Sequence, residues 1–299
     1  MLRIGLDIGG TKTELIALDA RGRECLRRRV ATPRADYQAA LAGLAGMVRE
    51  AERELGERAT VGIGLPGAIS PRSGLVTNAH STPYNGKALK IDLERLLGRE
   101  LRFENDANCF AHSEATDGAA RGARTVFGAI LGTGAGGGIV VDGRILGGAS
   151  GFAGEWGHNP LPWMTPQEFP GPRCYCGRCG CIERFISGPA LAADHEITAG
   201  VRLAPEEIAA RAEAGDAACT RSLARFEARV ARALAHVINI LDPDIIVLGG
   251  GLSKIDRIYA RVPAQWDAYV YSRGAATRLV RPAHGDSSGV RGAARLWRD

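Results

Sequence analysis

Hydrophobic runs separated by short polar breaks predict strands and then a helix in the first part of the chain. The run from Leu2 to Ile8 ends in Gly9-Gly10-Thr11-Lys12, and two further runs, Thr13 to Leu18 and Glu24 to Ala31, have the length and composition of strands. From Tyr37 to Leu55, apolar residues recur at three- and four-residue steps, which predicts an amphipathic helix.

The same alternation continues into the next part of the chain. A short buried strand is expected from Val61 to Leu65, followed by a turn-rich stretch from Ser70 to Lys90. A helix near Asp92 to Leu97, a strand from Leu101 to Phe103 and a helix opening at Asp106 come next. Three strands followed by αβαβα form a recurrent half-domain of the α/β class.

A second half begins around Arg121 and repeats the glycine-tipped hairpin. Val126 to Leu131 and Gly138 to Val141 predict two strands, joined through Gly132 to Gly137. The two hairpins, one in each half, therefore predict a duplicated phosphate clamp.

The remainder of the second half is predicted to be mostly helical. A cysteine-rich loop and two helices follow the hairpin, and one of these helices runs from Ala217 to Leu241 and stops at Asp242-Pro243. A strand from Ile245 to Leu248 leads into Gly249-Gly250-Gly251. The last helix, Ser288 to Leu296, is expected to return and pack on the first half.

Composition narrows the class of protein. A chain of 299 residues that is 45% hydrophobic can bury a sizeable core as one large or two moderate domains. The net charge is +5, but the basic residues are scattered, so we expect no nucleic-acid partner. We find no signal-peptide core and no membrane-spanning run, and we expect a cytoplasmic protein without membrane partners.

The cysteines indicate one metal site in a reducing compartment. Four of the seven fall between Cys174 and Cys181, and the others are isolated in apolar settings. The four are too closely spaced for a comfortable all-cysteine tetrahedron, and His158, sixteen residues upstream, is a better fourth ligand. A site closed by three cysteines and one histidine is structural, because it leaves no open position for catalysis.

The glycine-rich strand ends are candidate phosphate sites. Backbone N–H groups at such turns can approach phosphate oxygens, and an adjacent Asp7 is suited to Mg²⁺ lying between carboxylate and phosphate. Taken alone, the turn from Gly9 to Lys12 is better explained as an ordinary hairpin turn, and the chain has no GxxxxGK[ST] loop. Two further glycine-tipped strand ends, at Gly132 and Gly249, favour the phosphate interpretation.

Together these motifs resemble the ROK family of bacterial sugar kinases over essentially the whole chain and in the family's order. The motifs are Gly5-Leu6-Asp7-Ile8-Gly9-Gly10-Thr11-Lys12, Glu104-Asn105-Asp106-Ala107-Asn108, Leu131-Gly132-Thr133-Gly134, Gly154-Glu155-Trp156-Gly157-His158 and the cysteine cluster from Cys174 to Cys181.

The resemblance implies a fold and a set of binding residues. The fold is the two-domain actin/hexokinase-like (ribonuclease H-like) ATPase fold with a cleft between the domains, divided as 1–118 plus 289–299 and 119–288. ATP and Mg²⁺ would be held by Gly5, Leu6, Asp7, Ile8, Gly9, Gly10, Thr11 and Lys12, by Gly132, Thr133, Gly134, Ala135, Gly136, Gly137 and Gly138, and by Gly249, Gly250 and Gly251 beside the nucleoside. Zinc would be held by His158, Cys174, Cys176 and Cys181, although Cys179 could replace one of these ligands.

The resemblance also assigns the chemistry to Asp106, as the base that takes the proton from the sugar hydroxyl. The simpler explanation of Asp106 is a helix N-cap, since Asn and Asp are common there. The sugar hydroxyls would be bound by Asn78, Asn105, Asp106, Glu155, His158 and Glu183. His158 would bridge zinc and sugar through its two ring nitrogens.

The resemblance of individual segments to subgroups of the family implies the substrate and the partners. The segments from Pro66 to Pro71, Asn78 to Thr82 and Glu155 to Trp163 are most similar to the family's fructokinases, which implies D-fructose, or mannose, phosphorylated at the 6-hydroxyl. Trp156 is expected to fill part of the space that the acetamido group of N-acetylglucosamine would need. The alternatives are an N-acetylglucosamine kinase or a glucokinase. The expected partners are a hexose and ATP, with a homodimer as an option.

A sugar-responsive regulatory protein is the alternative outside enzymes. A repressor would need a DNA-binding helix-turn-helix ahead of the first strand, which starts at Leu2, so we expect a kinase.

Overall fold

The first half of the chain forms a five-stranded mixed sheet, as the apolar runs predicted. The computed structural model describes residues 1–33, 36–79 and 82–297. The strands are β1 (Arg3–Ile8), β2 (Lys12–Leu18), β3 (Glu24–Ala31), β4 (Thr60–Leu65) and β7 (Arg102–Asn105). Their order is β3-β2-β1-β4-β7, with β1, β2 and β3 antiparallel and β4 and β7 parallel to β1.

The second half forms a sheet with the same topology. Its strands are β8 (Thr125–Leu131), β9 (Ala135–Val141), β10 (Arg144–Ile145), β11 (Ile245–Gly249) and β12 (Arg278–Val280). The order β10-β9-β8-β11-β12 again places an antiparallel hairpin beside parallel strands. Two sheets with one topology are the hexokinase-like α/β arrangement that was expected.

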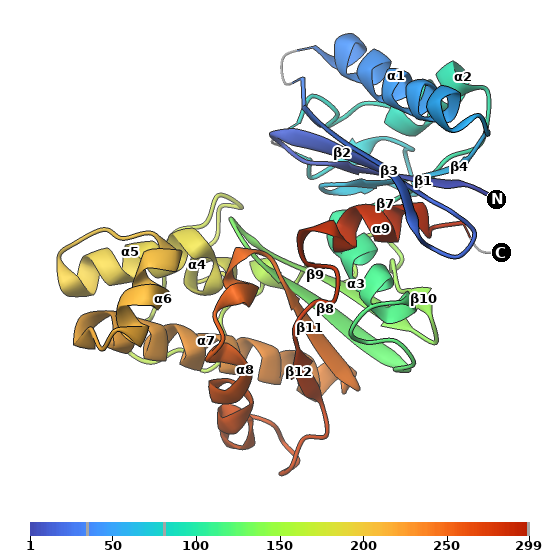
Figure 1. The fold of residues 1–299 in the computed structure, drawn as a ribbon. Coiled ribbons are helices and arrows are strands. Elements are labelled where there is room, and N and C mark those ends of the chain that lie inside the picture. The colour runs from blue at the N-terminus through green and yellow to red at the C-terminus, as the bar shows by residue number, and fades with distance from the viewer. Residues whose placement is uncertain (34–35, 80–81, 298–299) are drawn as a thin grey trace.

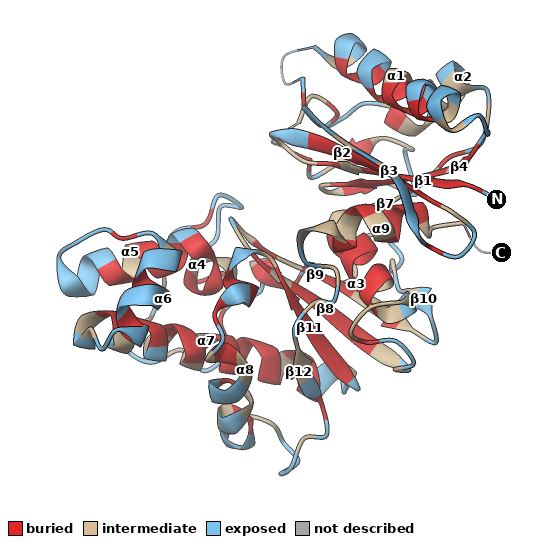
Figure 2. Ribbon diagram, viewed as in Figure 1, coloured by how far each residue is buried: buried red, intermediate tan, exposed pale blue. Residues whose placement is uncertain are grey.

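Amphipathic helices cover the outer faces of both sheets. Helices α1 (Tyr37–Leu55) and α2 (Leu89–Leu97) lie over the first sheet, and α5 (Gly188–Ala199), α6 (Pro205–Glu213) and α7 (Ala217–Leu241) belong to the second half (Figure 1). Each helix is buried where it packs on the protein and exposed on its opposite face (Figure 2), and α5 and α6 pack on α7 instead of on a sheet. None of the described helices is long and apolar enough to cross a membrane.

Two helices lie between the sheets and connect the halves. Figure 1 shows α3 (Asp106–Thr116) and α9 (Ser288–Ala294) stacked there. Helix α9 packs on β1, β2 and β4, which confirms the expected return of the last helix to the first half. Helix α3 packs on α9 and on β8 and β9. Because α3 contacts both α9 and the second sheet, its packing does not test the predicted domain boundary at residue 118, which stays a prediction. Residues 298–299 lie outside the residues that the structure describes.

Glycines make this close packing feasible. A Cβ at Gly5 would lie 2.1 Å from the Val290 carbonyl oxygen, and one at Gly292 would lie 1.8 Å from the Cys109 carbonyl oxygen. A Cβ at Gly138 would lie 2.3 Å from the Ala107 carbonyl oxygen. The strands and helices therefore touch backbone to backbone, which no larger residue allows at these positions.

Several elements differ from the sequence-based expectations. The turn between β8 and β9 is shorter than predicted, because β9 begins at Ala135 and the Gly132 N–H donates to the Gly134 carbonyl oxygen at 2.9 Å. The turn-rich stretch contains a small hairpin, β5 (Ala68–Ile69) with β6 (Val76–Thr77). The short elements β10, β12, α4 (Glu183–Ile186) and α8 (Ile258–Arg261) were not predicted, and one helix without bounds was expected where the structure has α5 and α6.

Replacing Gly5 by Ala is expected to lower the free energy of unfolding by about 1–3 kcal/mol, because the new methyl group must displace the α9 backbone. Gly43→Ala is the matched control: Gly43 lies inside α1 with no heavy atom within 4 Å of its ideal Cβ. That change is expected to stabilise the protein by about 0.5–1 kcal/mol. Urea denaturation measures both, and equal stabilities for Gly5→Ala and the parent would contradict the packing described above.

Candidate active site

A cavity of about 710 Å³ opens between the two sheets and is lined from both halves of the chain. The first half contributes Asp7, Ile8, Gly9, Gly10, Lys12, Pro66, Asn78, Asp106, Ala107 and Phe110. The second half contributes Ile130, Gly132, Thr133, Gly134, Ala135, Gly136, Glu155, His158, Tyr175, Glu183, Gly250, Gly285 and Gly289. Residues distant in sequence thus share one cleft, and they include each residue that we expected to bind sugar except Asn105.

The two hairpin turns form facing parts of the cavity wall. Gly9 and Gly10 come from the turn between β1 and β2, and Gly132 and Gly134 come from the turn between β8 and β9. The Gly9 N–H donates to the Lys12 carbonyl oxygen at 2.9 Å. Turns of this kind leave backbone N–H groups available to anions. The equivalent place of both turns in two sheets of one topology agrees with the duplicated clamp expected from sequence.

Asp7 lies at the end of β1 with its carboxyl group in a crowded setting. An added Cβ at Gly64 or Gly289 would stand 3.7 Å from Asp7 Oδ1 or 3.3 Å from its Oδ2, respectively. Burial, followed by the nearby charge of Asp106, raises the pKa of Asp7 to about 7. A carboxyl group held in this way gains from a neighbouring cation, and Lys12 supplies part of that charge.

Asp106 is the first residue of α3, but the helix cap is its neighbour. The Asn105 side-chain oxygen accepts hydrogen bonds from the N–H groups of Ala107 at 2.9 Å and Asn108 at 3.3 Å. The N-cap explanation therefore belongs to Asn105. Asp106 keeps part of its surface open to the cleft, and burial of its carboxyl group is the main cause that raises its pKa to about 6.

Asn105 and Asn78 are held beside the cavity by the loop at Gly67. The Asn105 amide donates to the Gly67 carbonyl oxygen at 3.0 Å, so one amide N–H stays available. Asn78 has a φ of 61°, a left-handed conformation uncommon for a residue other than glycine. A strained backbone at a cavity wall is typical of functional positions. His80 and Ser81 of the segment that suggested the substrate lie outside the described residues.

Glu183, at the start of α4, approaches the second hairpin turn. Its Oε2 accepts a hydrogen bond from the Ala135 N–H at 3.2 Å. A Cβ at Gly134 would lie 2.4 Å from the same oxygen, so a glycine there lets the carboxylate reach the cavity. Glu155 lies on the same wall, and partial burial raises the pKa of its carboxyl group, an effect that His158 opposes and the charge of Glu183 reinforces.

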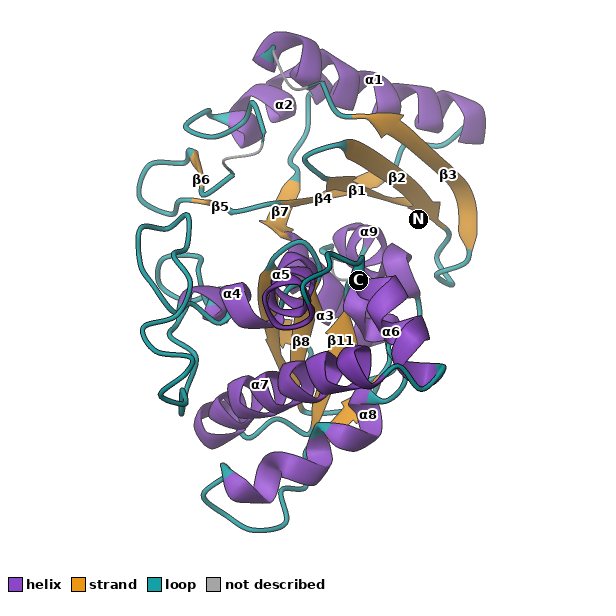
Figure 3. Cartoon of the chain, turned by 90° about the vertical axis from the view of Figure 1, so that its left-hand side faces the viewer, coloured by secondary structure: helices purple, strands orange, loops and turns teal. Residues whose placement is uncertain are grey.

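One histidine and three cysteines form a compact cluster on the long loop that precedes α4, the irregular segment visible in Figure 3. Their ligand atoms, one each from His158, Cys174, Cys176 and Cys181, lie within 4.8 Å of one another. His158 Nδ1 stands 3.6 Å from Cys174 Sγ, and Cys176 Sγ stands 3.5 Å from Cys181 Sγ. Zn–S bonds of about 2.3 Å in a tetrahedron place sulfurs about 3.8 Å apart, so the cluster fits zinc.

The other ring nitrogen of His158 points to Tyr175. Nε2 stands 2.9 Å from the Tyr175 hydroxyl oxygen, and the two rings meet edge to face with centroids 5.1 Å apart. In this structure, a tyrosine therefore occupies the side of His158 that was expected to face the sugar. The sequence analysis did not single out Tyr175.

Seven of the expected ATP-binding residues do not line this cavity: Gly5, Leu6, Thr11, Gly137, Gly138, Gly249 and Gly251. Gly5 and Gly138 are packing glycines, and a Cβ at Gly249 would lie 2.7 Å from the Phe110 ring. Leu6 is fully buried in the core of the first half. A glycine-rich motif mixes residues that face a ligand with residues that face a neighbouring backbone, and spacing alone does not separate them.

Trp156 also lies away from the cavity. It is 5% exposed, its Nε1 donates to the Gly136 carbonyl oxygen at 2.8 Å, and its ring meets Phe127 edge to face. The expectation that Trp156 fills part of the sugar site is therefore wrong. Although Trp156 is adjacent in sequence to Glu155, an expected sugar ligand, it packs in the hydrophobic core of the second half.

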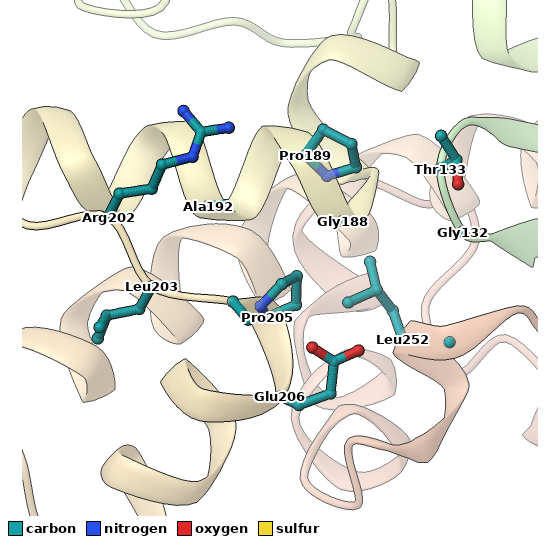
Figure 4. Close-up of a pocket in the computed structure, with 12 residues that line it drawn as sticks. Gly132, Thr133, Gly188, Pro189, Ala192, Arg202, Leu203, Pro205, Glu206 and Leu252 are labelled. Atoms are coloured by element: carbon teal, nitrogen blue, oxygen red, sulfur yellow. The ribbon is translucent and has the colours of Figure 1, made fainter.

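A second cavity, of about 630 Å³, adjoins the first at Gly132 and Thr133 (Figure 4). Its remaining lining residues come from α5, α6 and the turn after β11: Gly188, Pro189, Ala192, Arg202, Leu203, Ala204, Pro205, Glu206, Gly251 and Leu252. Of these lining residues, the sequence predicted Gly132, Thr133 and Gly251. The Ser187-Gly188-Pro189 helix start was a usable signal, because Ser187 caps α5 and proline favours the first turn.

The fold and the cleft together define a hexokinase-like α/β protein with paired glycine turns over a carboxylate. The model of the ROK family matches residues 3–299, and the chain belongs to that family.

Individual relatives agree with this assignment. The chain is 40% identical over 296 residues to an N-acetyl-D-glucosamine kinase of Pectobacterium atrosepticum, covering 98% of this chain and 97% of the relative. It is 38% identical to an N-acetyl-D-glucosamine kinase of Photobacterium profundum, covering 98% of each chain.

Solved structures share the fold. A ROK hexokinase from Thermus thermophilus superposes with a TM-score of 0.86 at 32% identity, covering 98% of this chain and 97% of that one. A ROK glucokinase from Streptomyces griseus in complex with glucose and AMPPNP has a TM-score of 0.81 at 28% identity, covering 99% of each chain.

Proposed function

We propose that this protein is a sugar kinase that transfers the γ-phosphoryl group of ATP to the 6-hydroxyl of N-acetyl-D-glucosamine. The observation that carries the proposal is the single cavity in which Asp106 faces two glycine turns and the Glu155, His158 and Glu183 side chains. A carboxylate, a set of hydroxyl ligands and two anion-binding turns are what phosphoryl transfer to a sugar requires.

In the proposed reaction, Asp106 accepts the proton of the 6-hydroxyl as that oxygen forms its bond to the γ-phosphorus. The bond between the γ-phosphorus and the bridging oxygen breaks, and ADP leaves. The turn between β1 and β2 and the turn between β8 and β9 would hold phosphate oxygens through backbone N–H groups that are not used inside the turns. Bound Mg²⁺ would neutralise phosphate charge, and the Asp7 carboxyl group fits a place beside it because its pKa is raised by burial and by a like charge.

Sugar hydroxyls would be bound by the wall that faces Asp106. The carboxylates of Glu155 and Glu183 would accept hydrogen bonds from hydroxyl groups, whereas Asn105 lies beside the cavity without lining it. Tyr175 or a sugar hydroxyl can occupy His158 Nε2, so sugar binding through His158 would displace the tyrosine contact.

The choice of hexose rests on two supports. The relatives named above are N-acetyl-D-glucosamine kinases, which favours the alternative we had kept over D-fructose. The preference for fructose also depended on Trp156 filling the space that an acetamido group would need. Trp156 packs in the core instead, so this reason against N-acetyl-D-glucosamine is removed.

We further propose that His158, Cys174, Cys176 and Cys181 hold a structural zinc ion. The support is the close approach of these four ligand atoms, a group that does not include Cys179. The ion would fix the loop that carries His158 and leads into Glu183.

Asp106→Asn is expected to lower kcat by about 10²–10⁴-fold with little change in stability, because it removes the base and keeps the size of the side chain. Steady-state kinetics and thermal unfolding check both parts. In the parent, kcat/KM should fall as the pH drops through about 6–7, the region set by the raised pKa values of Asp106 and Asp7, since the protonated carboxyl groups accept no proton. A variant with parental kcat, or a parent with flat activity down to pH 5, would refute the role of Asp106.

A hexose panel at saturating Mg-ATP tests the substrate. N-acetyl-D-glucosamine should have the highest kcat/KM, with fructose, mannose and glucose lower by about ten-fold or more, since an unmatched buried polar group costs about 1–3 kcal/mol. A higher kcat/KM for fructose would reject the substrate and keep the kinase.

Metal analysis tests the zinc site. The purified protein should contain about one zinc per chain, Cys181→Ser should lose it together with stability, and Cys179→Ser should retain it. Zinc lost from Cys179→Ser and kept by Cys181→Ser would mean that the ligand set is wrong.

A further inference from the structure

The second cavity has few side chains that can form hydrogen bonds with a ligand. Of its lining residues, only Thr133, Arg202 and Glu206 carry polar side chains, and the others are glycine, alanine, proline or leucine. Thr133 lies on the edge shared with the central cavity, where phosphates are proposed to bind. Recognition of the rest of a nucleotide by side chains therefore falls to Arg202 or Glu206.

Arg202 is already engaged. Its Nη1 donates to Glu196 Oε2 at 2.9 Å, and Figure 4 shows its guanidinium group turned away from Glu206. The Glu206 carboxylate lies beside Pro205 and Leu252 in the same view. Arginine is a donor only, so it also cannot accept a hydrogen bond from a hydroxyl group.

Glu206 differs from the acidic residue next to it on α6. Glu207 forms an ion pair with Arg211, one helical turn later. The residue one turn after Glu206 is Ala210, which has no charge. The Glu206 side chain has no hydrogen-bond or ion-pair partner among the residues that the structure describes. Glu206 and Glu207 both lie in the first turn of α6, where the helix dipole stabilises a negative charge. The dipole acts on both residues, so it does not explain why Glu207 is paired and Glu206 is not.

We propose that Glu206 accepts a hydrogen bond from a ribose hydroxyl of the nucleotide and makes the enzyme selective for ribonucleotides. This inference rests on the proposed use of ATP. Phosphates near Thr133 would direct the ribose and the base along the cavity, past Pro189 and Leu252 and toward Glu206 (Figure 4). A vicinal diol offers two O–H donors, and a carboxylate offers two acceptor oxygens, whereas phosphates would be repelled. Glu206 is exposed, so its carboxylate is accessible to a nucleotide that enters the cavity from solvent.

The test is calorimetric binding of ADP, 2′-deoxy-ADP and 3′-deoxy-ADP to the full chain and its variants. The parent should bind at least one deoxynucleotide about ten-fold more weakly than ADP, the usual size of a lost hydrogen bond to a charged group. Glu206→Ala should bind ADP about ten-fold more weakly and should no longer distinguish it from that deoxynucleotide. Glu207→Ala, on the same helical turn, should match the parent.

Three results would overturn the role of Glu206. These are equal binding of the three nucleotides by the parent, discrimination retained by Glu206→Ala, and a loss in Glu206→Ala that weakens all three nucleotides by the same factor. Inosine diphosphate is the further arm: discrimination against it that Glu206→Ala removes would place the carboxylate on the base and overturn the ribose contact.

The role of Glu206 can be rejected independently of the proposed function, because nucleotide binding is measured without phosphoryl transfer. Sugar phosphorylation by a parent that ignores the missing hydroxyl rejects only the role of Glu206. Selective ADP binding without phosphorylation of any hexose rejects the kinase and supports the ribose contact. A parent that binds no ADP rejects both.

Discussion

The cleft depends on backbone-to-backbone contact between the two helices at its base and the sheets on either side. Helix α9 touches β1 at Gly5 and β4 at Gly62, where a Cβ would lie 2.1 and 1.9 Å from carbonyl oxygens of α9. Helix α3 touches β9 at Gly138 and touches α9 at Gly292. Since packed interiors tolerate little added volume, these glycines fix how far apart the two glycine turns stand.

This packing also sets the electrostatics of the site. Asp7 is the penultimate residue of β1 and Asp106 begins α3, and protein surrounds the carboxyl group of each. Desolvation raises both pKa values, and the like charge of Asp106 adds to the rise at Asp7. A site with two such groups suits a reaction in which one carboxyl group takes a proton and the other lies near a bound cation and phosphates.

The cysteine loop contributes to the same cleft from the second half. It has almost no regular secondary structure between β10 and α4, yet it must hold His158 and Glu183 in place. A four-ligand metal site would supply the order that strands and helices supply elsewhere, and it would do so next to the sugar. Gly134 complements this arrangement, because the missing Cβ lets Glu183 reach the hairpin turn.

The sequence by itself determined the elements with strong periodicity and the residues with distinctive chemistry. The bounds of β3, α1 and α7 agree with the structure, because strand composition and helical spacing are local properties. The cluster of His158 with Cys174, Cys176 and Cys181 was also recognisable, and the structure brings these four together.

Only the tertiary structure decided which glycines face the cleft and which pack against a helix, and which aromatic residues build the core. Gly5 and Gly9 belong to one motif, but Gly5 lies within β1 where the strand meets α9, whereas Gly9 lies in the turn after β1 and lines the cavity. Trp156 and Glu206 show the same limit. Whether a side chain contacts a ligand depends on which distant parts of the chain pack beside it. The local sequence does not specify those neighbours.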